Sequence, residues 1–457
     1  MTKKVITSLL AAILLVSMIA GCAAPAPAAT PVPAAPAAAQ ATAAPAAPAA
    51  TEKPAAAAPT TVKLALWDYD LYGYDKAIVE SCMKKYPNIK VEVVSIPNAD
   101  FDNKVNIMLS GGEDLDVIYA KSVLLFGNLI AKNQLMDLKP FLEKDKIDLK
   151  PYGASIASYM AMGDKIVGLP YRYDRYLLYY NKDLFDAAGE PYPGPDMTWD
   201  DYRALAKKMT KGEGASKTYG AFFAPVNYFF LTPGLQEGKG DYSTLDYNVF
   251  REGWDNFYNM MYTDKSAQDW PSNKSVSADQ TYFEKGTAAM AINGSWYMNT
   301  MKSDIDAGKT KIRWGAQRVP VSKAMKAAGV HASNASITPV VMNAKTKNPE
   351  AAWTLLKCIA SEDAGKIMAS YLITPGFYSP AVVDAMAEVK GFDPSAKDAI
   401  LKSGAAYPAV SGANKNAGAL ATLMNQQLEL LFTKNQDLDK TIAELTRQRN
   451  EIVAQNK

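Results

Sequence analysis

The chain has 457 residues, 49 of them basic and 47 acidic, and a formal net charge of +2. Because charges of both signs are interspersed along the chain, the composition does not indicate a nucleic-acid partner. His331 is the only histidine, so a zinc site with several histidines is excluded and a Ser-His-Asp triad would depend on that one residue. We find no glycine-rich phosphate loop and predict no cofactor.

The N-terminus has the pattern of a secretory signal peptide. Lys3 and Lys4 precede a nearly uncharged apolar run from Val5 to Ala20, and small residues follow this run. At about 1.5 Å per residue, the run is shorter than the ~30 Å of hydrocarbon that a transmembrane helix must cross. The alternative is a signal anchor that stays uncleaved.

A lipid attachment site is predicted at Cys22, the last residue of this 1–22 segment. The residues Ile19-Ala20-Gly21-Cys22 resemble the lipobox of bacterial lipoproteins, in which the cysteine is lipidated and becomes the new N-terminus. Its acyl chains would hold the protein on the extracellular side of the cell membrane, because each buried methylene contributes roughly 0.8 kcal/mol.

Residues 23–60 are almost entirely alanine, proline and threonine. Such a segment has no large apolar side chains to bury, so it cannot offset the entropy of folding. Repeated prolines exclude a long helix and keep the chain extended. We predict a spacer that holds a globular body away from the membrane.

The body begins at Thr61 and comprises about 400 residues, enough for two lobes with separate cores. In its first part, strands are predicted at 62–67, 89–96 and 115–119, with helices from about 75 to before Pro87 and from about 100 to Gly111-Gly112. This alternation favours a mostly parallel sheet with helices on both faces.

The pattern after Pro140 mixes strands and helices less regularly. Strands are predicted at 165–170, 176–180, 219–223 and 288–292, and helices at 198–211, 250–262 and from Asn348 onward. Thr198-Trp199-Asp200-Asp201 has the form of a capping box. One face of a C-terminal helix would carry Leu438, Ile442, Leu445 and Ile452.

Cys82 and Cys358 are the only cysteines of the body. They could form one disulfide, because exported proteins fold in an oxidising environment. Two buried thiols are the favoured interpretation, since unpaired cysteine is among the most buried residue types.

Several motifs occur in one order along the body. They are Gly168 to Tyr171, Tyr180 to Phe185, Thr198 to Asp201, Phe283 to Met290 followed by Asn293-Gly294-Ser295-Trp296, and Asn348 to Trp353. Behind a lipobox and a spacer, these motifs resemble the extracellular solute-binding proteins of bacterial ABC importers. The closest group is the sugar-binding family 1, which includes maltose-binding proteins.

The resemblance implies an α/β fold of the two-lobed periplasmic-binding-protein type (type II), with hinge-linked lobes and the ligand in the cleft between them. It places the chain crossings near 172–174 and 331–334, with a return near Pro380. Lobe 1 would then comprise 61–173 with 334–380, and lobe 2 would comprise 174–333 with 381–457. The resemblance also implies delivery of the ligand to the membrane subunits of an ABC permease.

Candidate ligand-binding residues follow the predicted strands, because open α/β sheets bind ligands beyond the carboxyl ends of their strands. Trp67, Asp68 and Tyr69 follow the first strand, and Tyr119 with Lys121 ends the third. Sugars pack their C–H patches on aromatic faces and need fixed polar partners for their hydroxyls. A turn with one buried tryptophan is the alternative for the first group.

The segment from Tyr171 to Tyr176 is the richest in charged and aromatic side chains. In an extended conformation, Arg172, Asp174 and Tyr176 share one face, while Tyr173 and Arg175 lie opposite. The resemblance aligns Asp174 with an acidic ligand residue of the family. The alternative is an Asp–Arg ion pair that stiffens the hinge.

Four further residues complete the candidate ligand-binding set. The resemblance aligns Trp296 with a stacking tryptophan of the family, and a tryptophan that fills the second lobe's core is the alternative. Tyr228 follows the strand near Phe223, Asn334 lies at the second crossing, and Arg175 lies at the first.

The predicted function is capture of a mono- or oligosaccharide by a monomeric, lipid-anchored binding protein that performs no catalysis. Two alternatives stay open. An exported glycoside hydrolase would use two of Asp68, Asp70 and Asp174, with carboxyl groups about 5 to 10 Å apart. A binding protein for an anionic solute would use Lys121, Arg172 and Arg175.

Overall fold

The computed structural model describes residues 59–153, 159–224, 229–276, 278–390, 392–401, 404–410 and 414–455. All of them belong to the second of two units, 1–56 and 57–457, into which backbone contacts divide the chain. The predicted signal peptide, Cys22, the spacer up to residue 58, and Tyr228 therefore lie outside the described residues.

A nine-stranded mixed sheet forms the framework, with the order β2-β1-β3-β10-β6-β8-β7, β11 beside β10 and β9 beside β6. The strands are β1 Thr60–Trp67, β2 Ile89–Ile96, β3 Val117–Tyr119, β6 Leu169–Asn181, β7 Tyr219–Phe222, β8 Ala288–Gly294, β9 Trp314–Arg318, β10 Ala332–Met342 and β11 Ala405–Pro408. The short strands β4 Ala161–Met162 and β5 Lys165–Ile166 pair only with each other.

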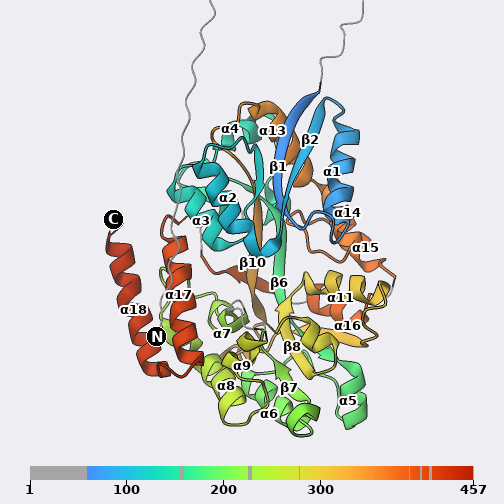
Figure 1. The fold of residues 1–457 in the computed structure, drawn as a ribbon, viewed down its shortest axis with the longest axis vertical. Coiled ribbons are helices and arrows are strands. Elements are labelled where there is room, and N and C mark those ends of the chain that lie inside the picture. Colours follow the sequence, from blue (N-terminus) through green and yellow to red (C-terminus); the bar gives the residue numbers. More distant parts are fainter. Residues whose placement is uncertain are drawn as a thin grey trace, which may run out of the picture. The chain divides into compact units, whose positions relative to one another are not determined.

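Two long strands, β6 and β10, join the two parts of this sheet (Figure 1). β6 pairs with β10 along residues 169–175 and with β8 and β9 along residues 176–181. The predicted parallel pairing is confirmed for β1 with β2 and β3. The two strands that cross between the parts, β6 and β10, pair antiparallel with each other, and β10 also pairs antiparallel with β3. Only β11 pairs parallel with β10. The sheet is therefore mixed, because the chain crosses back between its two parts.

The helices of the described residues cover the sheet, and none of them is long and apolar enough to cross a membrane. They are α1 Tyr74–Lys85, α2 Phe101–Ser110, α3 Val123–Ala131, α4 Lys139–Lys144, α5 Lys182–Ala188, α6 Trp199–Met209, α7 Thr232–Leu235, α8 Arg251–Tyr262, α9 Trp270–Ser275, α10 Thr281–Glu284, α11 Tyr297–Asp306, α12 Lys323–Ala327, α13 Pro349–Ile359, α14 Glu362–Ser370, α15 Pro380–Ala387, α16 Pro394–Leu401, α17 Ala417–Phe432 and α18 Leu438–Gln455.

Local sequence signals account for several helix ends. The predicted capping box opens α6, since the Thr198 hydroxyl accepts from the Asp201 backbone N–H and the Asp201 carboxylate accepts from that of Thr198. Pro349 occupies the first turn of α13, where its missing N–H is not needed. Gly112 follows α2 with a φ of 79°, a backbone conformation that favours glycine.

The segment predicted as two strands, 165–170 and 176–180, differs in the structure. Residues 165–166 form the short strand β5, and Leu169–Asn181 is one continuous strand. The charged side chains at its centre are unusual for a buried strand, but Arg172 and Asp174 form an ion pair within the strand. A charged pair can stay buried in a strand when its partners are supplied by the fold.

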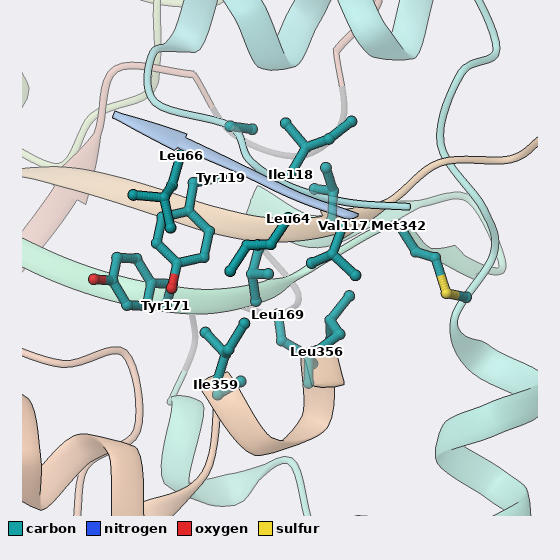
Figure 2. Close-up of a cluster of buried hydrophobic side chains, with 14 of the residues drawn as sticks. Leu64, Leu66, Val117, Ile118, Tyr119, Leu169, Tyr171, Met342, Leu356 and Ile359 are labelled. Carbon is teal, nitrogen blue, oxygen red and sulfur yellow. The ribbon is translucent and has the colours of Figure 1, made fainter. Parts of the chain in front are cut away.

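Four clusters of buried side chains form the core, and the smallest contains Val321, Met325 and Ala332. The first draws on residues 62–171 and 335–373, and Figure 2 shows strand residues such as Leu64 and Val117 packing with Leu356 and Ile359 of α13. Beyond the crossing, Tyr176 and Leu178 belong to the second cluster and Leu177 to the third. The two clusters therefore lie on opposite faces of β6. The exact residues at which one lobe ends and the other begins stay a prediction.

Cys82 of α1 and Cys358 of α13 form a disulfide, so the prediction of two buried thiols is wrong. Both residues are buried, as expected, but their Cα atoms lie 5.9 Å apart although 276 positions separate them in the sequence. Packing of α1 beside α13 brings them together, and the spacing of the cysteines carries no information about that contact.

Candidate functional site

The loop that follows β1 places an aromatic ring and a carboxylate at the carboxyl end of the sheet. The Trp67 ring is partly buried and makes edge contacts with Phe101 at 5.6 Å and Tyr119 at 6.1 Å. Asp68 has a φ of 48°, which turns the chain away from the strand, and its carboxylate accepts from the backbone N–H of Asn98 at 3.1 Å. Tyr69 is also partly exposed, and its backbone N–H donates to the Ser95 hydroxyl at 3.3 Å.

Lys121 converges on the same place from the end of β3. Its ammonium group donates to the backbone oxygen of Asn98 at 2.5 Å and to the side-chain oxygen of Asn98 at 2.8 Å. Burial lowers the pKa of Lys121, and Asp102 and Asp68 partly oppose that effect. Asp68 and Lys121, both predicted site residues, thus meet at Asn98, which the sequence interpretation missed. Its position directly after β2, at the same sheet edge, was the signal that could have indicated it.

Tyr119 points into the core rather than toward this polar group. It is only 1% exposed, and its ring centre lies 4.2 Å from that of Tyr171. A second aromatic group lies nearby, where Tyr72 stacks on Tyr74 at 6.3 Å and Tyr74 makes an edge contact with Tyr371. Tyr72 is partly exposed and follows the same strand end as Trp67.

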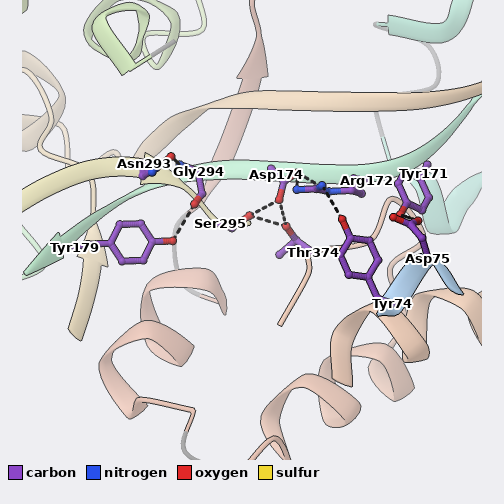
Figure 3. Close-up of polar contacts among 10 residues, drawn as sticks. All are labelled: Tyr74, Asp75, Tyr171, Arg172, Asp174, Tyr179, Asn293, Gly294, Ser295 and Thr374. Atoms are coloured by element: carbon purple, nitrogen blue, oxygen red, sulfur yellow. Dashed lines mark hydrogen bonds and ion pairs between the residues drawn. The ribbon is translucent and has the colours of Figure 1, made fainter. Parts of the chain in front are cut away.

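Asp174 lies at the centre of a buried polar network on the crossing strand (Figure 3). Arg172 donates to one carboxylate oxygen, with its Nη2 at 2.8 Å, while the hydroxyls of Ser295 and Thr374 each donate to the other oxygen at 2.8 Å. Asp174 is 1% exposed. Both of its oxygens are therefore used within the protein, which favours the ion-pair interpretation over direct ligand contact in this conformation.

The network continues from Arg172 into the N-terminus of α1. Arg172 Nη1 donates to the Tyr74 hydroxyl at 3.4 Å, and the Tyr171 hydroxyl donates to Asp75. Burial acts to lower the pKa of Arg172, but the effects of Asp174, Tyr74, Tyr171 and Asp75 together outweigh it and raise that pKa. Burial raises the pKa of Asp75 to about 7, against the lowering effects of Tyr171 and Arg172.

Trp296 packs against each of the three larger core clusters. It follows Ser295 at the end of β8, is partly buried, and makes an edge contact with the Tyr176 ring at 5.6 Å. The Trp296 ring covers Gly294 so closely that a Cβ at position 294 would lie 1.9 Å from it. Glycine is therefore required there for the ring to take this position.

Two further predicted site residues, Asn334 and Arg175, lie on opposite faces of the paired strands β10 and β6. Asn334 of β10 is buried and accepts from the Thr232 hydroxyl at 2.6 Å. Ser336 pairs with Asp174 across the ladder, so Asn334, two residues away, lies on the face of Asp174. Arg175 points to the opposite face, where it donates to the backbone oxygens of Ile400 at 3.2 Å and Gly404 at 3.4 Å. The predicted alternation along this segment is confirmed.

The sequence model of one protein family, the bacterial extracellular solute-binding proteins, matches residues 70–366 of this chain. The chain belongs to this family. The predicted two-lobed α/β fold is confirmed as well, since solved structures of the family cover most of the chain. A sugar transporter of Rhizobium etli in an open conformation is 28% identical, with a TM-score of 0.72 over 86% of this chain and 99% of that one. An ABC substrate-binding protein of Listeria monocytogenes in complex with cycloalternan is 20% identical, with a TM-score of 0.75 over 87% and 99%.

A curated relative shares a shorter region. The maltodextrin-binding protein of Bacillus subtilis is 26% identical over 266 residues, which are 54% of this chain and 58% of that protein. The chain therefore spans little more than half of the length of this relative. The family is one of proteins that bind solutes.

Proposed function

We propose that this protein is the substrate-binding lipoprotein of an ABC importer, and that it captures a carbohydrate between its two lobes for delivery to a membrane permease. The observation that best supports the proposal is the position of the polar and aromatic side chains. Trp67 ends β1, Lys121 and Trp296 lie just beyond β3 and β8, and all three side chains are partly exposed. The relatives include a sugar transporter and a maltodextrin-binding protein, which agrees with a carbohydrate ligand.

Trp67 and Trp296 are proposed to stack on the sugar, and the group formed by Asp68, Asn98 and Lys121 to bind its hydroxyls. Aromatic faces match the C–H patches of a sugar, and polar groups already held by hydrogen bonds need little further ordering on binding. Asp174 is proposed to position Trp296 rather than to contact the sugar, because it accepts a hydrogen bond from the Ser295 hydroxyl and so holds the turn before Trp296.

Calorimetry on Trp296→Ala tests the proposal against a matched aromatic variant. Titration of the purified protein with maltooligosaccharides should show binding that Trp296→Ala weakens by about 1–3 kcal/mol. Tyr192→Ala is the control, since Tyr192 is an exposed aromatic residue on the loop after α5. Equal affinities of the two variants, with a lower melting temperature for Trp296→Ala alone, would assign Trp296 to the core.

A hydrolase is the competing function, and it makes a different prediction. Incubation of the protein with the bound sugar should yield no product by chromatography. Product that disappears in Asp68→Asn would contradict the binding-protein proposal and identify a catalytic carboxylate. Asp68 is the more informative target, because Asp174 is nearly unexposed and paired with Arg172.

The anchor is proposed at Cys22, and the extracellular side of the cell membrane is the proposed location. The family is described as extracellular, which agrees with export. The lipobox pattern before Cys22 supports lipidation of this residue. A single acyl chain gives only marginal membrane binding, so stable anchoring would require more than one chain.

A further inference from the structure

A cavity of about 340 Å³ lies against the face of β6 that carries Tyr173 and Arg175. Its walls come from both sides of the chain crossing: residues 150–153, the segment 374–378, helix α15, and the residues around the end of α16 and the start of β11. Asp174 points to the other face of the same strand. The residues proposed to bind the carbohydrate are not among those that line the cavity, so the cavity is separate from that site.

The walls of this cavity are mainly apolar. They include Pro151, Val382, Val383, Met386, Ile400 and Leu401. The charged residues that line it within the described chain are Lys150 and Arg175, both basic, and no acidic residue of that part lines it. Such walls suit a ligand with an apolar body and one negative charge. They suit a sugar poorly, because few polar side chains are available for its hydroxyls.

Arg175 is held in place at the cavity wall. Its Nη1 donates to the backbone oxygens of Ile400 and Gly404, both near the connection between α16 and β11. Burial lowers the pKa of Arg175, because the charged guanidinium has lost part of its hydration. An anion beside a partly desolvated guanidinium forms a charge-assisted hydrogen bond, which is stronger than a bond between neutral groups.

We propose that this cavity is a second ligand-binding site, which takes a small amphipathic monoanion such as an aliphatic carboxylate or an aryl sulfonate. The anionic group contacts Arg175, and the apolar body packs on Val382, Val383 and Met386 of α15. The cavity volume lies near the lower end of the range for small-molecule sites, so the ligand is limited to a short chain or a few rings.

Fluorescence titration with 8-anilinonaphthalene-1-sulfonate tests the site, with decanoate and the neutral decanol as competitors. The purified full-length protein should bind the probe saturably, and decanoate should displace it. Arg175→Gln should weaken decanoate about tenfold, the effect of losing a charge-assisted hydrogen bond, and weaken decanol by less than roughly twofold. Arg251→Gln, which removes a half-exposed arginine of α8, should change neither value.

A second variant tests the cavity itself. Val383 is partly exposed on α15, and Val383→Trp should fill the cavity and abolish displacement by both competitors. If that variant shows no cooperative melting transition and is therefore unfolded, Tyr378→Ala replaces it, since Tyr378 lines the cavity and is 57% exposed. The proposal is overturned if the probe does not saturate, or if the folded variants bind decanoate as the parent does. Maltooligosaccharide titration of the same variants, without probe or competitor, tests the proposed carbohydrate site separately.

Discussion

Removal of Arg172 should reveal how much the buried ion pair at the crossing contributes to stability. The side chains of Arg172 and Asp174 are 8% and 2% exposed, and their charged atoms lie 2.8 Å apart. Arg172→Met leaves the Asp174 carboxylate buried with only the hydroxyls of Ser295 and Thr374 as polar partners. Loss of one partner from such a pair costs about 3–5 kcal/mol, because the remaining charge is uncompensated.

Urea unfolding of the parent and four variants measures this cost. Arg172→Met should shift the midpoint strongly, with little change in the slope that reflects exposed surface. Asp174→Asn should also destabilise, while the double variant should cost less than the sum by about 0.5–3 kcal/mol, since no charge is left unpaired. The surface pair of Arg313 and Asp183, 58% and 50% exposed, provides the control. Arg313→Met should leave the midpoint nearly unchanged, because exposed ion pairs contribute little to stability.

The reasoning would be refuted by either of two results. One is an Arg172→Met variant as stable as Arg313→Met, which would mean that water or another donor compensates Asp174. The other is strict additivity in the double variant, which would show that the two residues stabilise the fold independently.

Three more predictions follow from other parts of the molecule. Cys82→Ala should lower the free energy of unfolding by about 2–5 kcal/mol, and reducing agent should lower the melting temperature of the parent but not of the variant. Burial raises the pKa of Asp75 to about 7, so its contribution to the free energy of unfolding should be lost as pH rises from about 4 to about 7, by at most about 1.4 kcal/mol per pH unit. Urea unfolding at several pH values should show this loss in the parent, and Asp75→Asn should make the free energy of unfolding less dependent on pH in this range. Cys22→Ala should release the protein into the medium or leave the signal peptide uncut, and mass spectrometry of membrane-bound parent with an unmodified Cys22 would contradict the proposed anchor.

Much of the fold could be predicted where the signal is local. Strand β2 matches its predicted bounds, and the capping box at Thr198 has the predicted hydrogen bonds. The sequence predicted two strands where the structure has the single strand β6, because residues distant in sequence stabilise the charged centre of that strand. Thr374 and Ser295 lie 200 and 121 positions from Asp174. No window of sequence contains these partners, and the same reason hides the disulfide.

The candidate site was predictable to the extent that strand ends define it. Asp68 and Lys121 meet because β1 and β3 run parallel and end at one edge. Asn98 contacts both, and only its position just beyond β2 could have indicated it, because a single asparagine carries no pattern of its own. Thr374 was missed for the opposite reason, since it lies in an irregular segment that reaches β6 only through tertiary packing.

The alternation of β6 has a consequence for both proposed sites. Asp174 and Arg175 are neighbours in sequence, but consecutive strand residues point to opposite faces, so each side chain serves a different environment. On one face Asp174 fixes the turn before Trp296, and on the other Arg175 forms part of a cavity wall. Since β6 belongs to both parts of the sheet, a change in its path on lobe closure would move both groups together. A ligand on either face that prefers one arrangement of the lobes would then alter affinity on the other face by the same factor.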